Sequence, residues 1–401
     1  MSVATERRVG DRRGVSRREW PGYEMGERLG SLRVVICCGS GGVGKTTVSA
    51  ALAMSIAATQ GERVLVLTVD PARRLATALG LKGIGTDAVT ISRARLRAAG
   101  LPARGEVAAA MLDMKAEWDR MVERYAPDRR SAQRILGNRF YQRISDAFIG
   151  SHEYAAMEAL YELYESGEYD CVVIDTPPSR NALDFLEAPA RLTDYVGAKL
   201  LSYLAGPSGF GLRAMNLAAA PFLRLADRLL GSEVLEEVSD FVRQLQTLYG
   251  GVQRRARDMY RLLRSPEVGF VVVTTLEPGP FTEAEFFISK LREYAMPLRA
   301  LVVNRVLPDA LRDADAAAAA TTLAEDPRIS SWLSTELGER FSPETVRGAG
   351  QTHLMFHALA SRDARQLARL EREIEVPVSR IPLFTDDVSE IEGLVRIAGL
   401  L

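Results

Sequence analysis

Residues 39–46 carry the pattern with the clearest chemical meaning in the chain, Gly-Ser-Gly-Gly-Val-Gly-Lys-Thr. It fits the phosphate-binding consensus G-x-x-x-x-G-K-S/T at every fixed position. Its glycines let the backbone wrap closely around phosphate oxygens, and consecutive N–H groups at a helix N-terminus attract negative charge. Lys45 is expected to reach the β- and γ-phosphates, and the Thr46 hydroxyl is expected to ligate Mg²⁺. The predicted nucleotide contacts are Gly39, Ser40, Gly41, Gly42, Val43, Gly44, Lys45, Thr46 and Thr47.

An aspartate ends each of two apolar runs that are typical of buried strands. In phosphate-loop enzymes, an aspartate placed like Asp175 holds Mg²⁺ beside the loop threonine. Asp70 would meet the γ-phosphate at the carboxyl end of its strand, where it could orient or activate the attacking water. Asp70 also suits a helix N-cap before Pro71, and the two roles are compatible. The predicted catalytic residues are Asp70 and Lys45, and the predicted metal ligands are Thr46 and Asp175.

Two further segments are candidates for contacts with the base of the nucleotide. Asn304 follows an apolar run at residues 299–303, so its amide would lie on the ligand side of a sheet, where it could hydrogen-bond the adenine edge. Asn304 could instead be a turn former. Residues 381–384 follow the last predicted strand as a loop that could pack on a base, with Pro382 and Leu383 as the predicted contacts.

The elements that must position these residues follow a strand-and-helix pattern. The Ala-, Leu- and Met-rich residues 46–58 predict a helix directly after the phosphate loop, and residues 352–373 predict a long helix near the C-terminus. Short apolar runs predict buried strands at residues 34–38, 63–69, 169–175, 268–276, 299–303 and 376–380. The predicted fold is therefore α/β: a phosphate-loop NTPase with a mostly parallel central sheet flanked by helices.

Two long segments between the predicted strands indicate insertions. Residues 83–167, with helical stretches such as 106–125, exceed a simple crossover helix and predict an inserted helical layer. Residues 180–263 are again helical and apolar in places, which suits either a groove for a client or the core of a helical subdomain. The low-complexity residues 313–320 predict a loop or a fraying helix.

Composition sets limits on location and partners. The 401 residues contain 47% hydrophobic and 26% charged residues, ordinary values for a globular protein, and the formal net charge of −1 gives no general attraction to nucleic acid. Neither a run of about 18 apolar residues nor a hydrophobic signal core is present in the sequence, so a cytoplasmic protein is expected. The arginine-rich residues 1–30 predict a disordered basic arm, and residues 31–401 a single domain.

Taken together, these motifs resemble the ArsA family, which comprises arsenite-pump-driving ATPases and related ATPases that target tail-anchored membrane proteins. The resemblance covers nearly the whole chain from about residue 32. It rests on the phosphate loop at 39–47, Asp-Pro-Ala at 70–72, Asp-Thr-Pro-Pro-Ser at 175–179, Val-Asn at 303–304 and Ile-Pro-Leu at 381–383. It implies an ATPase of the deviant-Walker type that uses ATP and Mg²⁺ and dimerises face to face. It further implies that Asp70 activates water and that helical subdomains move as the nucleotide turns over.

Ser40 departs from the family pattern, because the family's loop usually carries a signature lysine at this position. That lysine reaches across the dimer to the phosphates bound by the partner and supports hydrolysis. The chain has five lysines in total, and Lys45 is the one within the loop. The departure predicts either slow hydrolysis by a homodimer or a heterodimer with a related ATPase that supplies the lysine.

Other departures concern arsenite and the dimer clasp. The chain has one phosphate loop, whereas the arsenite-pump ATPases are typically tandem duplications. Its three cysteines, Cys37, Cys38 and Cys171, lie in predicted core strands, so activation by arsenite is not expected. The Cys-x-x-Cys zinc clasp of the eukaryotic targeting factors is absent from the sequence. Arg73 stands where the family usually has a histidine directly after Asp-Pro-Ala.

The sequence therefore predicts an ATP hydrolase whose conformational cycle powers or gates another process, such as the handling of a client or a membrane protein. Two alternatives remain. One is a weakly hydrolysing, nucleotide-gated chaperone that binds a hydrophobic client or a membrane-associated partner. The other is the regulatory half of a heterodimer. No specific contact with nucleic acid is predicted.

Overall fold

The computed structural model describes residues 23–69, 74–81, 84–102, 104–138, 141, 152–176, 248, 250–338, 341–386, 388 and 390–401. Several predictions from the sequence lie outside these residues. They concern Asp70, Arg73, residues 177–179, most of the N-terminal arm and most of the second helical insertion.

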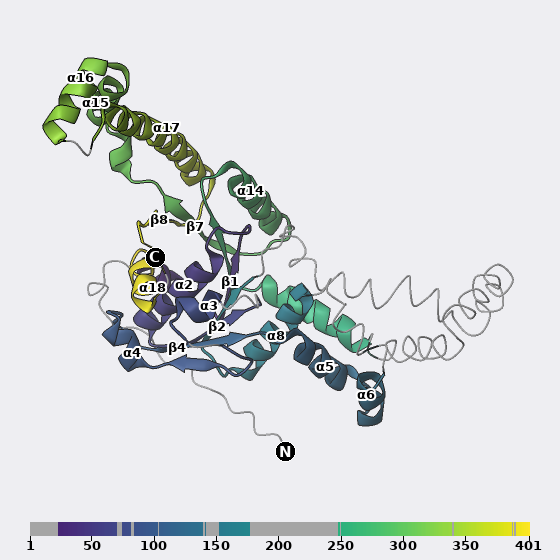
Figure 1. Ribbon diagram of the computed structural model, residues 1–401. Helices are drawn as coiled ribbons and strands as arrows, with labels where there is room; N and C mark the ends of the chain where they lie inside the picture. Colours follow the sequence, from purple (N-terminus) through teal and green to yellow (C-terminus); the bar gives the residue numbers. More distant parts are fainter. Residues whose placement is uncertain are drawn as a thin grey trace, which may run out of the picture.

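A central eight-stranded sheet organises the described residues, with the order β3-β4-β2-β5-β1-β6-β7-β8 (Figure 1). All neighbouring strands are parallel except β3 and β4, which are antiparallel. The strands are β1 (Val34–Cys38), β2 (Arg63–Thr68), β3 (Val89–Ile91), β4 (Glu106–Met111), β5 (Cys171–Asp175), β6 (Val268–Thr274), β7 (Leu298–Val306) and β8 (Val378–Pro382). The predicted mostly parallel sheet is confirmed.

Alternating side chains of the buried strands supply two hydrophobic layers, one on each face of the sheet. In β1, Val34 and Ile36 belong to one layer, and Val35 and Cys37 to the other. The first face is covered by α5 (Met114–Tyr125), α6 (Arg129–Leu136), α8 (His152–Ser166), a helix that includes residues 250–263, and α14 (Pro278–Glu293). The second is covered by α1 (Glu24–Leu29), α2 (Lys45–Gln60), α3 (Arg74–Ala78), α4 (Arg93–Ala98) and α18 (Ile391–Ala398). Helices on both faces are what a parallel sheet requires.

A helical lobe extends away from the sheet between β7 and β8 (Figure 1). It consists of η2 (Asp309–Arg312), α15 (Ala314–Glu325), α16 (Pro327–Leu337) and the N-terminal half of α17 (Pro343–Glu373). Residues 313–320, predicted as a loop or a fraying helix, form the N-cap and the first turns of α15. The Asp313 side chain caps this helix by accepting a hydrogen bond from the Ala316 N–H at 2.8 Å. Of the helices that the structure describes, none is both long and apolar enough to cross a membrane.

Two predicted boundaries are wrong. The segment at residues 83–167 is not helical throughout, because it contains β3 and β4. The alanine-rich run of β4 has the composition of a helix, but it is buried as a strand between β2 and β3. The predicted disordered arm at residues 1–30 includes α1, whose Met25 and Leu29 are spaced by four residues and are both buried against the layer around α2.

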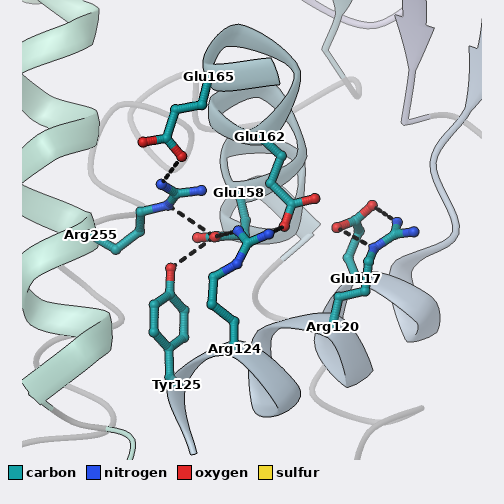
Figure 2. Close-up of polar contacts among 8 residues, drawn as sticks. All are labelled: Glu117, Arg120, Arg124, Tyr125, Glu158, Glu162, Glu165 and Arg255. Carbon is teal, nitrogen blue, oxygen red and sulfur yellow. Dashed lines mark hydrogen bonds and ion pairs between the residues drawn. The ribbon is translucent and has the colours of Figure 1, made fainter. Parts of the chain in front are cut away.

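A buried ion-pair network joins α5, α8 and the helix at 250–263 (Figure 2). Glu158 on α8 is 2% exposed, and its Oε1 accepts hydrogen bonds from Arg255 Nε at 3.0 Å and Arg124 Nη1 at 3.0 Å. The Tyr125 hydroxyl donates to the same oxygen at 2.8 Å. Burial, followed by the charge of Glu158, raises the pKa of Tyr125, so the phenol remains a neutral donor. The network fixes α8 directly before β5.

Removing Glu158 is expected to lower the free energy of unfolding by about 3 kcal/mol, because it leaves the buried Arg255 guanidinium without its one buried carboxylate partner among the described residues. Urea denaturation of Glu158→Ala measures this change. Glu165→Ala is the matched control: Glu165 also pairs with Arg255 but is 55% exposed, so its loss should cost less than about 1 kcal/mol. Equal effects of the two substitutions would show that burial of Glu158 does not determine the stability of the network.

Candidate nucleotide-binding site

The carboxyl ends of the parallel strands gather the predicted site residues at one edge of the sheet. The phosphate loop follows β1, Asp175 ends β5, and Asn304 lies near the end of β7. Ligands of open α/β sheets bind at this edge. Residues far apart in the sequence therefore meet because their strands run parallel in one sheet.

The phosphate loop has the backbone that its glycines predict. Gly39, Gly42 and Gly44 have φ angles of 152°, 79° and 92°, which favour glycine. A Cβ atom at Gly39 would lie 2.1 Å from the Val273 carbonyl oxygen of β6, so this position also excludes a side chain sterically. Gly44 is the N-cap residue of α2. The loop thus ends on a helix N-terminus, which has unsatisfied N–H groups and a partial positive charge.

The Lys45 side chain lies back over this loop. Lys45 is 6% exposed, and its Nζ donates a hydrogen bond to the Ser40 carbonyl oxygen at 2.8 Å. Ser40 is 8% exposed, and its Oγ has no hydrogen-bond partner among the residues that the structure describes. A buried ammonium group beside a curved, glycine-rich backbone suits an anionic ligand.

Thr46 and Asp175 lie in direct contact, although they are 129 residues apart. The Thr46 hydroxyl donates to Asp175 Oδ2 at 2.7 Å, and Asp175 is 1% exposed. Thr68, the last residue of β2, donates its hydroxyl to the same oxygen at 3.0 Å. A hydroxyl and a carboxylate oxygen are hard donors of the kind that Mg²⁺ prefers, so these residues fit the metal predicted from the sequence.

Thr68 is a site residue that the sequence interpretation missed. Its signal was its place at the end of an apolar run, two residues before Asp70. Thr176 is a second neighbour of the site, and its hydroxyl donates to the Cys37 carbonyl oxygen at 2.8 Å. Both threonines anchor the polypeptide around Asp175, so the carboxylate has a defined position.

Asn304 contacts the phosphate loop itself. Its Nδ2 donates to the Val43 carbonyl oxygen at 2.8 Å, and its Oδ1 accepts from the Arg305 N–H at 2.9 Å. The contact with an adenine edge stays a prediction.

The predicted base-packing loop at residues 381–384 begins later than expected. Pro382 ends β8, and Ile381 is fully buried in the core, so these two residues belong to the strand. Leu383 follows with its side chain 46% exposed, and its N–H donates to the Val306 carbonyl oxygen of β7 at 2.9 Å. Pro382 at the end of β8 and Leu383 directly after it therefore lie at the carboxyl edge of the sheet, where ligands of open α/β sheets bind.

The three cysteines lie in the strands in which they were predicted, Cys37 and Cys38 in β1 and Cys171 in β5, and all are buried. Burial raises the pKa of the Cys37 thiol to about 12 and also raises those of Cys38 and Cys171. At neutral pH these thiols are protonated, and thiolates are the form that binds soft metals.

Comparisons with known proteins agree with this geometry. The family model described as anion-transporting ATPase matches residues 32–347. The ATPase get3 of Schizosaccharomyces japonicus is 28% identical over 284 residues, which cover 70% of this chain and 76% of that protein. A protein of Aquifex aeolicus named as arsenical pump-driving ATPase 2 is 24% identical over 288 residues, which cover 70% of this chain and 83% of that protein. Because the family match spans most of the chain and coincides with a phosphate-loop NTPase fold, the chain belongs to the ArsA family of anion-transporting ATPases.

Proposed function

We propose that this chain binds ATP with Mg²⁺ at the phosphate loop and hydrolyses it. The observation that carries the proposal is the contact of 2.7 Å between the Thr46 hydroxyl and the buried Asp175 carboxylate, next to the loop that contains Lys45. A phosphate loop alone can bind many phosphorylated ligands. A hydroxyl and a carboxylate together at its base are the groups that hold Mg²⁺ in phosphate-loop NTPases.

Each residue has a proposed role. The backbone of residues 39–44 cradles the phosphates, Lys45 neutralises the charge on the β- and γ-phosphates, and Thr46 and Asp175 hold Mg²⁺. The metal, when bound, neutralises charge on the phosphate oxygens. Asp70 orients or activates the attacking water, as its place after β2 suggests.

We further propose that hydrolysis drives closure of a dimer and thereby powers or gates the handling of a client or a membrane protein. The support is the membership of a family of ATPases and the likeness to the ATPases named get3. Ser40 favours a slow homodimer, or a heterodimer in which a related ATPase supplies a lysine.

Substituting Ser40 with lysine tests the proposed effect of the missing lysine. Ser40→Lys is expected to raise the steady-state rate of phosphate release at least about tenfold, because it adds a cation that can reach the phosphates across a dimer. Ser40→Ala is the control, since it removes the hydroxyl without adding charge and should not raise the rate. A wild-type rate that is already fast, and unchanged in Ser40→Lys, would contradict slow hydrolysis caused by Ser40.

The same Ser40 supports a second candidate, a nucleotide-gated chaperone that retains its client while ATP stays bound. The two functions differ in an observable quantity. The ATPase cycle predicts continuous phosphate release and release of a bound hydrophobic peptide. The gated chaperone predicts retention of the peptide with MgATP and little phosphate release.

A further inference from the structure

One side chain attaches the phosphate loop to the end of β7. Asn304 Nδ2 donates to the Val43 carbonyl oxygen at 2.8 Å, across 261 residues of sequence. Val43 itself is 1% exposed and belongs to the hydrophobic layer around α2. The loop residue between Gly42 and Gly44 is therefore held on both sides, by its side chain in the core and by its carbonyl group on Asn304.

The backbone that presents Asn304 is irregular. The pairing of β7 with β8 shifts register between Val303 and Val306, and Arg305 has a φ of 59°, an uncommon value for a residue other than glycine. The Arg305 N–H donates to Asn304 Oδ1 at 2.9 Å, so this bond and the bond to Val43 use opposite ends of one amide. Both bonds require the same orientation of the amide, with Nδ2 toward the loop.

Gly44 lies against the same amide. Gly44 has a φ of 92°, and a Cβ atom there would lie 2.4 Å from Asn304 Nδ2. The amide therefore packs directly on the residue that precedes Lys45 and α2. A displacement of Asn304 would therefore remove a packing contact from Gly44, the residue at which the phosphate loop joins α2.

We infer that Asn304 is a positioning residue for the phosphate loop: its amide fixes the Val43–Gly44 peptide so that the loop holds its phosphate-binding shape. This inference rests on the proposed binding of a nucleoside triphosphate and differs from the adenine contact expected for Asn304. A contact with the base would contribute to the affinity for one purine over another. A contact that positions the loop would contribute to the affinity for the phosphates, whatever base they carry.

Ligands with and without a base separate the two roles. Isothermal titration calorimetry of the full chain with Mg²⁺ measures the affinities for ATP, GTP and inorganic tripolyphosphate. For Asn304→Ala we expect the affinities for ATP and tripolyphosphate to fall by similar factors of about tenfold, the loss that corresponds to one hydrogen bond. The ratio of the ATP and GTP affinities should stay within about twofold of the wild-type ratio.

Two further variants keep the test decisive. Asn304→Asp is nearly isosteric and retains an acceptor for the Arg305 N–H but has no donor for Val43, so it should bind at least as weakly as Asn304→Ala. Asn138→Ala is the matched control, because Asn138 also bonds the backbone through its amide, accepting from the Tyr141 N–H at 3.1 Å, but lies away from the site. It should bind all three ligands like the wild type.

The results distinguish failure of this inference from failure of the proposed function. A wild-type chain that binds neither ATP nor tripolyphosphate would overturn the proposed function and this inference with it. A wild-type chain that binds ATP, with Asn304 variants that lose ATP affinity alone or change the ratio of ATP to GTP affinities, would overturn only the positioning role. Affinities equal to those of the wild type in both Asn304 variants would also overturn only the positioning role.

Discussion

Replacing Lys45 with alanine is expected to lower the rate of ATP hydrolysis by roughly 100-fold or more, the scale on which a preorganised charge donor contributes to a transition state. Lys45 is 6% exposed and bonds the Ser40 carbonyl oxygen within the loop, so its ammonium is already held beside the proposed phosphate position. Phosphate release measured at saturating MgATP, together with the affinity for ATP, separates loss of catalysis from loss of binding.

The control for Lys45→Ala is Lys290→Ala. Lys290 lies on α14 and pairs with Glu293 on the same helix, at a distance of 2.6 Å, so it shares the chemistry of Lys45 but not its position. Lys290→Ala should hydrolyse ATP like the wild type. If Lys45→Ala retains more than about a tenth of the wild-type rate, hydrolysis does not depend on this loop in the way proposed.

Asp175→Asn is expected to reduce Mg²⁺-dependent hydrolysis by roughly 100-fold and to weaken the dependence of ATP binding on Mg²⁺. The amide keeps the size of the side chain and can still accept from the Thr46 and Thr68 hydroxyls, which lie 2.7 Å and 3.0 Å from Asp175 Oδ2. It loses the negative charge that favours a divalent cation. Titrating Mg²⁺ at fixed ATP measures the change.

The chain offers a control at the other end of the same strand. Asp170 precedes β5 and accepts a hydrogen bond from the Arg63 N–H at 2.9 Å. Asp170→Asn should leave the Mg²⁺ dependence unchanged. The account of the metal site is wrong if Asp175→Asn, with a melting temperature near that of the wild type, keeps the wild-type response to Mg²⁺.

Local patterns allowed the sequence to predict the centre of the fold. The phosphate loop, its glycines and the helix after it depend on contacts between close neighbours in the chain, so the elements around Lys45 could be predicted before the structure was known. The strand run before Asp175 is short, apolar and ends in a polar residue, which made β5 equally clear.

Elements whose burial depends on distant partners were harder to predict. The run at residues 106–111 has an alanine-rich composition typical of a helix, and pairing with β2 and β3 makes it a strand. Helix α1 is short, and it is stabilised because Met25 and Leu29 are buried against the rest of the fold, not by its own propensity.

In the candidate site too, features set by the local sequence were predicted, and features set by distant partners were not. The residue types at Thr46 and Asp175 predicted a metal site. Thr68 had only its position at the end of an apolar run as a signal, and its contact with Asp175 arises because β2 lies beside β5. The direction of the Asn304 amide depends on the irregular backbone at Arg305 and on the contact with Val43. Neither the irregular backbone at Arg305 nor the contact with Val43 has a signature in the sequence, because each arises from strands that meet in three dimensions.

The most direct test of the central claim is calorimetric titration of the purified full chain with ATP, performed with Mg²⁺ and with a chelator, for the wild type and Lys45→Ala. The account predicts one ATP site per chain that requires Mg²⁺ for full affinity and is lost, or weakened by roughly tenfold or more, in Lys45→Ala. Absence of ATP binding by the wild type, or equal binding by the wild type and Lys45→Ala, would contradict the account.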